Sequence, residues 1–122
     1  MARVVYYIGT PDGNFGWLRV GDAPVSSAEK KLTEIQHVQG PTVAWARRNG
    51  IRAIKLQGMG NKSLPDYMFM KDGQIRFIEF KRPGGIPSAL QANTINAFQS
   101  EGFKIQVHDT KESAIEWLKE LV

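Results

Sequence analysis

The most constraining feature of this sequence is a pair of short apolar segments separated by Lys-Asp-Gly-Gln at 71–74. An Asp-Gly pair between two apolar runs is a strong signal for a tight β-hairpin. We therefore expect one strand over 67–70 and a returning strand over 75–81. A hairpin of this kind needs further strands or helices to cover its apolar side chains, so the rest of the chain must supply them.

The open end of this hairpin carries charged residues that an ordinary surface hairpin does not need. Side chains two apart in a strand point the same way, so Glu79 and Lys81 share a face with Phe77. Pairing across the turn can bring Asp66 close to both. Taken singly, such residues most often form a surface salt bridge. Together, two carboxylates and an ammonium suit a site that holds a divalent metal beside a phosphate.

The remaining elements follow from apolar periodicity and capping signals. The sequence Gly40-Pro41 should separate two helices, because proline is disfavoured inside a helix. The helix after Ser88 is expected to bury a stripe of Leu90, Thr94, Ala97 and Phe98. In chain order we expect helices at about 27–38 and 41–49, a strand over 51–57, the hairpin, a helix over 88–100, a strand over 103–107, and a last helix capped by Thr110 or Asp109.

This order predicts one α/β domain with a mixed central sheet flanked by helices. A chain of 122 residues is long enough for one core and too short for two. The segment 1–24 reads as an accessory N-terminal hairpin, with strands over 3–8 and 15–20, and 26–122 as the core.

Composition limits the classes of function. The absence of cysteine excludes disulfides, thiolate zinc sites and cysteine catalysis. No apolar run approaches the roughly 20 residues that span a bilayer, so we expect a soluble protein without a membrane partner. A net charge of +4 favours an anionic partner.

The motif Pro65-Asp66 followed by Glu79-Phe80-Lys81 resembles the signature of PD-(D/E)XK nucleases. The longer run adds Ser63-Leu64 before it, Arg82-Pro83-Gly84-Gly85 after it, and Gln91 beyond. This run is similar to the VRR-NUC branch, which has G-V-P-D, then E-L-K often continued by R-P-G-G, then a helical Gln. The resemblance implies a restriction-endonuclease-like core in the order αβββαβ, and a metal-dependent hydrolase that cuts phosphodiester bonds in DNA.

The resemblance also implies roles for individual residues. Asp66 and Glu79 would ligate Mg²⁺, with Mn²⁺ as a substitute, and the Phe80 backbone carbonyl would be a third oxygen. Lys81 would orient or help deprotonate the attacking water, or stabilise the transition-state phosphate. Gln91 cannot act as a base, but its amide would hold the water or a phosphate oxygen in place.

A further acidic ligand is expected on the first core helix. Residues 36–39, near the matching place, contain no carboxylate, so Glu34 is the first choice and Glu29 the second. Ser63 replaces the glycine of the motif. Three cations are candidate contacts to DNA phosphates: Lys55, Lys62 and Arg82.

Stand-alone members of this size resemble phage proteins that act as homodimers on branched DNA such as four-way (Holliday) junctions. The resemblance thus implies a structure-specific DNA endonuclease in the cytoplasm of a bacterial or phage-infected cell. A nick- or flap-directed or restriction-like nuclease fits the same residues. The competing classes are a non-catalytic DNA-binding or assembly module that retains the nuclease fold, and a purely structural interaction domain.

Overall fold

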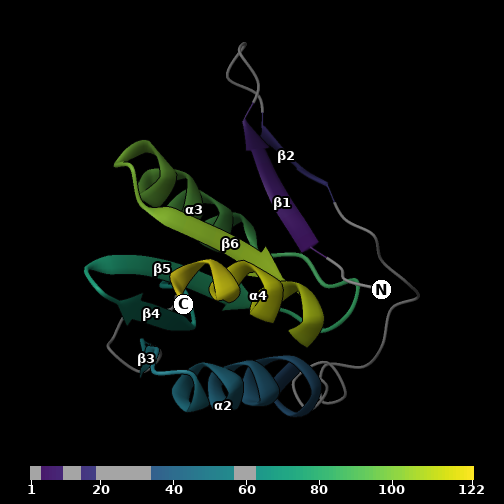
Figure 1. Cartoon of the computed structure of the whole chain (residues 1–122). Coiled ribbons are helices and arrows are strands. Elements are labelled where there is room, and N and C mark those ends of the chain that lie inside the picture. The colour runs from purple at the N-terminus through teal and green to yellow at the C-terminus, as the bar shows by residue number, and fades with distance from the viewer. Residues whose placement is uncertain (1–3, 10–14, 19–33, 57–62) are drawn as a thin grey trace.

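The computed structural model describes residues 4–9, 15–18, 34–56 and 63–122, and these form one six-stranded sheet with helices on both faces (Figure 1). The strands are β1 (Val4–Gly9), β2 (Phe15–Leu18), β3 (Arg52–Lys55), β4 (Tyr67–Lys71), β5 (Gln74–Phe80) and β6 (Lys104–His108). The helices are η1 (Glu34–Gln39), α2 (Gly40–Arg48), α3 (Ala89–Ser100), α4 (Lys111–Leu118) and the short η2 (Lys119–Leu121). Predictions for 27–33, for the end of the strand at 57, for Glu29 and for Lys62 fall outside the described residues.

The strand order is β2-β1-β6-β5-β4-β3. Only the β5–β6 pairing is parallel, and every other pairing between these strands is antiparallel. The predicted mixed α/β fold, with the core order helix, three strands, helix, strand, is confirmed.

The predicted hairpin supplies β5, one of the two central strands of the sheet, and β4 beside it. Its turn places Asp72 at φ 51° and Gly73 at φ 80°, the left-handed conformation at both central positions that the Asp-Gly pair favours. Lys71 pairs with Gln74 on either side of the turn. The alternation in β5 is as expected: Ile78 and Phe80 enter one core cluster and Phe77 enters the other.

Two apolar cores, one on each face, hold the helices to this sheet. On one face α2 and α4 pack on a cluster that includes Phe69 and Phe80, both fully buried. On the other face α3 packs through Ile95 and Phe98, and the Phe98 ring meets the Phe77 ring edge-on at a centroid distance of 4.9 Å. The sheet therefore has Glu79 on the same face as α3, between Phe77 and the end of the strand.

The predicted gap between two helices at Gly40-Pro41 is wrong. The chain stays helical from η1 into α2, and only the pitch changes, from a π-helix to an α-helix. Pro41 lies in the first turn of α2, where a missing backbone N–H costs little. Gly40 allows this junction because a Cβ there would stand 2.9 Å from the Ile35 carbonyl oxygen.

The predicted buried stripe of α3 is also wrong at two of its four positions. Leu90 is 59% exposed and Ala97 is exposed, whereas Ala92 and Ile95 are buried. The stripe that faces the sheet follows the spacing of Gln91, Ile95 and Phe98. Counting apolar residues alone missed this phase, because a polar residue, Gln91, occupies the first position of the inward stripe.

The N-terminal hairpin is part of the sheet. β1 pairs with β2 as predicted, and its first residues also pair antiparallel with β6, Val4 with His108 and Val5 with Val107 (Figure 1). Among the described helices, none is long and apolar enough to cross a membrane.

His108, at the end of β6, makes stability sensitive to acid. Burial lowers its pKa to about 3, while its ring nitrogens lie 2.9 Å from Ser113 Oγ and 2.7 Å from Gln106 Oε1. In the unfolded chain His108 is protonated below about pH 6.5, whereas in the folded protein it stays neutral down to about pH 3. As the pH falls from about 6.5 to about 3, the free energy of unfolding should therefore fall by up to about 1.4 kcal/mol per pH unit.

Urea unfolding of His108→Gln at several pH values tests this expectation. The variant should lose part of the acid-induced decline in unfolding free energy, whatever its stability at neutral pH. His37→Gln, which replaces an exposed histidine, is the control. Equal pH slopes in wild type and His108→Gln would contradict the assignment.

Candidate active site

Asp66 stands immediately before β4 and is fixed to both neighbouring strands. Its carbonyl accepts a hydrogen bond from Leu56 N at 2.9 Å, and its Oδ2 accepts one from Phe80 N at 2.8 Å. The residue is 1% exposed. The two hydrogen bonds hold this carboxylate against the end of β5, beside the backbone of Phe80.

Glu79 is a strongly perturbed carboxyl group in the site. It is 3% exposed, and its Oε2 accepts hydrogen bonds from Lys81 Nζ at 3.1 Å and from Gln91 Nε2. Burial, with the nearby charge of Asp66 as the second cause, raises the pKa of Glu79 to about 8, although Lys81 opposes the shift. Its other oxygen, Oε1, is buried without a hydrogen-bond partner in the described part of the chain.

Lys81 and Gln91 complete a closed network around Glu79. Lys81 Nζ also donates to Gln91 Oε1 at 3.0 Å, and its side chain is 18% exposed. Its backbone N–H donates to the His108 carbonyl at 3.0 Å, which continues the β5–β6 pairing by one residue. The ammonium is therefore anchored on the sheet and still reaches solvent.

Gln91 is placed by the start of α3. Ser88 is the N-cap, as predicted, and its Oγ accepts from Gln91 N at 3.2 Å while Gln91 Oε1 accepts from Ser88 N at 3.0 Å. This capping box fixes the first turn and leaves the Gln91 amide facing Glu79. The amide thus has a structural role as well as a place in the site.

The Arg-Pro-Gly-Gly segment forms the tight turn that leads from the site to α3. Gly85 N donates to the Arg82 carbonyl at 2.8 Å, and Gly84 has a positive φ of 80°. A Cβ on Gly85 would lie 3.1 Å from the Arg82 carbonyl oxygen and 3.2 Å from Lys81 Cβ. The glycines therefore let the chain turn closely enough for Gln91 to meet Glu79.

Asp109 anchors this turn, a role that the sequence analysis missed because it considered Asp109 only as a helix cap. Asp109 is fully buried, and its Oδ2 accepts from Gly84 N at 2.9 Å, while Thr110 is the actual N-cap of α4. Nothing in the local sequence signals a contact between residues 25 positions apart.

Asp109→Ala is expected to lower the free energy of unfolding by about 1–3 kcal/mol, because it leaves a buried backbone N–H of Gly84 without this acceptor. Chemical denaturation measures the change. Glu116→Ala, which removes an exposed carboxylate paired with Lys119, should cost at most about 0.5 kcal/mol. Similar losses in the two variants would show that Asp109 does not anchor the turn.

Glu34, the first choice for the helix carboxylate, opens η1 and lies within electrostatic range of the site. Its charge contributes to the raised pKa of Glu79. Within the described residues, however, no group of three or more His, Cys, Asp or Glu side chains is arranged to hold a metal ion. Of the two carboxylates that act on Glu79, Asp66 has the larger effect on its pKa.

The residues present fit a hard divalent cation. Mg²⁺ needs only one or two protein carboxylates and keeps several waters. A buried carboxylate oxygen without a hydrogen-bond donor, next to a second carboxylate, is costly, and Lys81, which pairs with the other oxygen of Glu79, offsets only part of that cost. The Asp66–Glu79 pair is therefore the part of the site suited to a metal.

The predicted phosphate contacts differ in exposure. Lys55 is exposed at the end of β3, next to the site. Arg82 is only 9% exposed, and its Nη1 donates to the Pro83 carbonyl at 2.7 Å. The burial of Arg82 does not support the expected contact with DNA.

Comparisons with known proteins agree with this architecture. No protein-family model matches the sequence, and no curated protein matches it. Among solved structures, one described as a "VRR_NUC domain" is similar, with a TM-score of 0.59 and 23% identity over 67% of this chain and 89% of that chain. The chain therefore has the α/β fold of a VRR_NUC domain.

Proposed function

We propose that this chain is a divalent-metal-dependent DNA endonuclease of the VRR-NUC family. The observation that carries the proposal is Glu79, a buried carboxylate held by Lys81 and Gln91 with one oxygen lacking a donor among the described residues. The cost of burying this group without full hydrogen bonding is hard to explain by stability alone. The shared fold supports the same interpretation.

Asp66 and Glu79 would hold the metal, with the Phe80 carbonyl and Glu34 as further oxygen donors. A bound Mg²⁺ supplies a water of lowered pKa and neutralises charge that develops on the phosphate. Asp66 is kept in place by the Phe80 N–H, so its carboxylate need not reorganise when a cation enters. Because the pKa of Glu79 is raised, Glu79 would bind the cation in its deprotonated form and would release any proton it carries to solvent.

Lys81 would then act on the substrate. Its ammonium is partly exposed and lies 3.1 Å from Glu79 Oε2, so it can reach a phosphate oxygen or the attacking water beside that carboxylate. Gln91, which bonds both Glu79 and Lys81, would keep the ammonium oriented. A positioned cation of this kind stabilises charge that appears only in the transition state.

We further propose branched DNA, such as a four-way junction, as the substrate, and a homodimer as the active form. The support is the motif resemblance to small stand-alone members of the family. Two sites related by a two-fold axis could cut two strands of a junction symmetrically.

The test is cleavage of end-labelled linear, nicked, flap and four-way-junction DNA with Mg²⁺, Mn²⁺ or EDTA, together with sedimentation of the protein alone. Metal-dependent cutting, fastest on the junction, and a dimer mass are expected. Cutting without a junction preference would overturn the branched substrate only. Binding without cutting in either metal would overturn the enzyme and leave a DNA-binding module that retains the fold.

A further inference from the structure

The positive charge of the chain comes from one region. Residues 35–65 contain five of the sixteen Lys and Arg residues and none of the twelve Asp and Glu residues. The remainder carries eleven cationic and twelve acidic side chains, so it has no cationic excess. A charge asymmetry of this size points to an anionic partner for this region.

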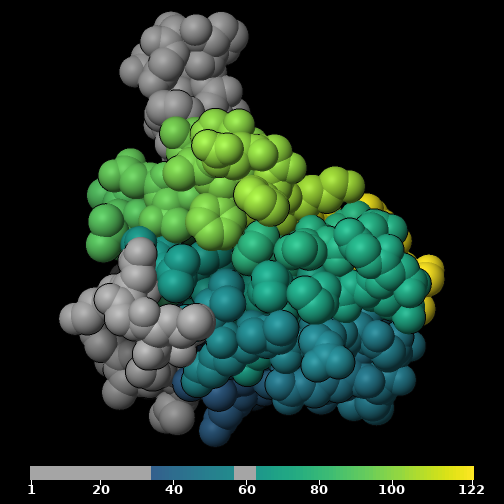
Figure 2. Space-filling view, turned by 90° about the vertical axis from the view of Figure 1, so that its left-hand side faces the viewer, coloured from purple at the N-terminus to yellow at the C-terminus, as the bar shows by residue number. Residues whose placement is uncertain are grey.

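The described part of this region is a continuous surface. It runs from the C-terminal turn of α2 into β3, which is the edge strand of the sheet. Arg48, Arg52 and Lys55 are all exposed along it, and Arg52 and Lys55, three residues apart in β3, lie on opposite faces of this edge strand and meet at its open edge. In Figure 2 the α2–β3 segment (blue) lies below the β4–β5 hairpin, and α3 lies above that hairpin.

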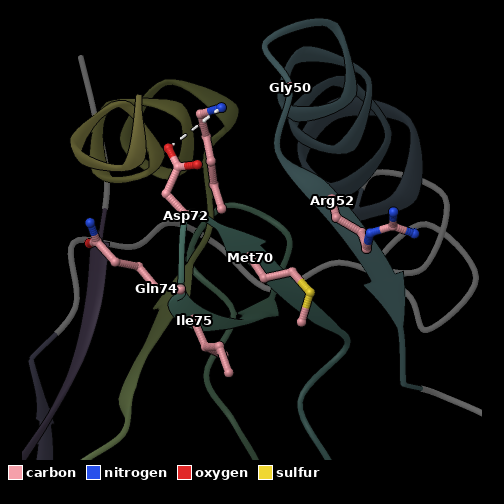
Figure 3. A pocket seen from close by; sticks show the side chains of 8 residues that line it. Gly50, Arg52, Met70, Asp72, Gln74 and Ile75 are labelled. Atoms are coloured by element: carbon pink, nitrogen blue, oxygen red, sulfur yellow. Dashed lines mark ion pairs between the residues drawn. The ribbon is translucent and has the colours of Figure 1, made fainter.

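Not every cation here is available to a ligand. Arg47 Nη2 donates to the Ala53 carbonyl at 3.3 Å, which ties α2 to β3. Lys71 pairs with Asp72 at 3.8 Å. Arg48 and Arg52 make no ion pair with any other described residue, and Figure 3 shows the Arg52 side chain extending away from Asp72.

Arg52 borders a surface pocket of about 360 Å³. The pocket lies between the C-terminal end of α2 and the hairpin turn, with Gly50, Met70, Gln74 and Ile75 among its other lining residues (Figure 3). Lys71 and Asp72 also line the pocket and pair with each other, so Arg52 leaves it with one net positive charge, which can admit an anionic group.

This surface is joined directly to the candidate active site. Leu56, which follows β3, bonds the carbonyl of Asp66, so one end of the edge strand touches the site. Leu56 lies four positions after Arg52, a length of about 13 Å in a strand. That length matches about four base pairs of duplex at the usual rise.

We propose that Arg48, Arg52 and Lys55 form a phosphate-binding surface that holds the DNA backbone flanking the cleaved bond, along the edge of β3. This proposal rests on the proposed function for its ligand and adds Arg48 and Arg52 as substrate-binding residues. Guanidinium groups suit the role because they bind phosphate oxygens through paired N–H groups. The contacts are to backbone, so they set affinity and register without sequence preference.

The test measures binding of a fluorescent duplex in EDTA as a function of KCl concentration. The double variant Arg48→Glu/Arg52→Glu should weaken binding at least tenfold and reduce the slope of log K against log salt by about 1.8, for two lost phosphate contacts. The matched control, Lys104→Glu/Lys111→Glu, makes the same change in net charge at exposed lysines outside this region. Thermal unfolding confirms that both variants fold.

A second measurement uses duplex length. Wild type should gain affinity as the flank beyond the cut site grows past about four base pairs, and Arg48→Glu/Arg52→Glu should gain much less. Equal weakening of DNA binding in both double variants would mean that only net charge matters, and would overturn the proposed surface. An unchanged Kd for DNA in Arg48→Glu/Arg52→Glu would also overturn it. If wild type binds but never cuts, the proposed function fails while the surface stands. If it cuts and the variant binds like the control, the surface fails alone.

Discussion

Lys81→Ala is expected to reduce the rate of DNA cleavage by about 10²- to 10⁴-fold while changing the Kd for DNA by less than about threefold. The size follows from the usual contribution of a positioned group that moves a proton or stabilises transition-state charge. Binding should persist because the exposed cations that attract DNA lie elsewhere, on α2 and β3. Single-turnover cleavage and anisotropy binding on the same labelled DNA measure the two quantities.

The control for this variant is Lys111→Ala, which removes an exposed lysine from the start of α4. It should leave the cleavage rate within about twofold. A Lys81→Ala enzyme that cuts at the wild-type rate would remove Lys81 from the mechanism. Parallel losses of binding and cleavage would instead assign it a role in holding DNA.

Glu79→Gln is expected to abolish cleavage and to stabilise the metal-free protein. The pKa of Glu79 is raised from 4.5 to about 8 in the folded protein, so the folded state binds a proton that the unfolded state has lost. The free energy of unfolding of wild type should therefore fall as pH rises from about 4.5 to about 8, by up to about 1.4 kcal/mol per pH unit. The neutral glutamine removes this decline.

Thermal unfolding at pH 5 and pH 8, with EDTA or with Mg²⁺, measures the effect. In EDTA the variant should exceed wild type in Tm most clearly at pH 8. Mg²⁺ should raise the Tm of wild type only, because a ligand that binds the folded state stabilises it. Glu112→Gln, at an exposed position on α4, is the control. A variant that is less stable than wild type at pH 8 would mean that Glu79 contributes to stability in its charged form.

A higher stability of Glu79→Gln in EDTA would fit a residue that is kept for function although it lowers stability. Arg76 offers a comparison, as a buried charged residue with a structural role. Arg76 is also buried, but it bonds the Trp117 carbonyl, pairs with Glu120 at 3.0 Å and lies over the Trp117 ring. Its Nε, like Glu79 Oε1, is buried without a hydrogen-bond partner among the described residues. Arg76 nevertheless fastens α4 to the sheet, whereas the partners of Glu79 belong to the candidate site.

Several features were predictable because they depend on neighbours in the chain. The hairpin turn requires left-handed backbone at both central positions, and Asp72-Gly73 favours that conformation, so the pair marks the position of the turn. The alternation of β5 and the Ser88 cap follow from spacings of two and three residues. These local rules were enough to bring Asp66 to the end of the strand that carries Glu79.

Other features depend on contacts between distant segments, which no local pattern encodes. The side of α3 that faces the sheet is set by Gln91, which bonds Glu79 on the same face of the sheet. The turn before α3 depends on Asp109. The continuity of η1 and α2 depends on the fit of Gly40 against the preceding turn.

The sequence by itself determined the hairpin, the order of the elements and the identity of the candidate site residues, since each rests on short-range geometry and residue chemistry. Only the tertiary structure decided that Glu79 is buried with one oxygen lacking a donor among the described residues, and that β1 joins the sheet beside β6. The reason is that burial, and the pKa it shifts, depend on every segment packed around a group. That information is absent from the residues on either side of Glu79.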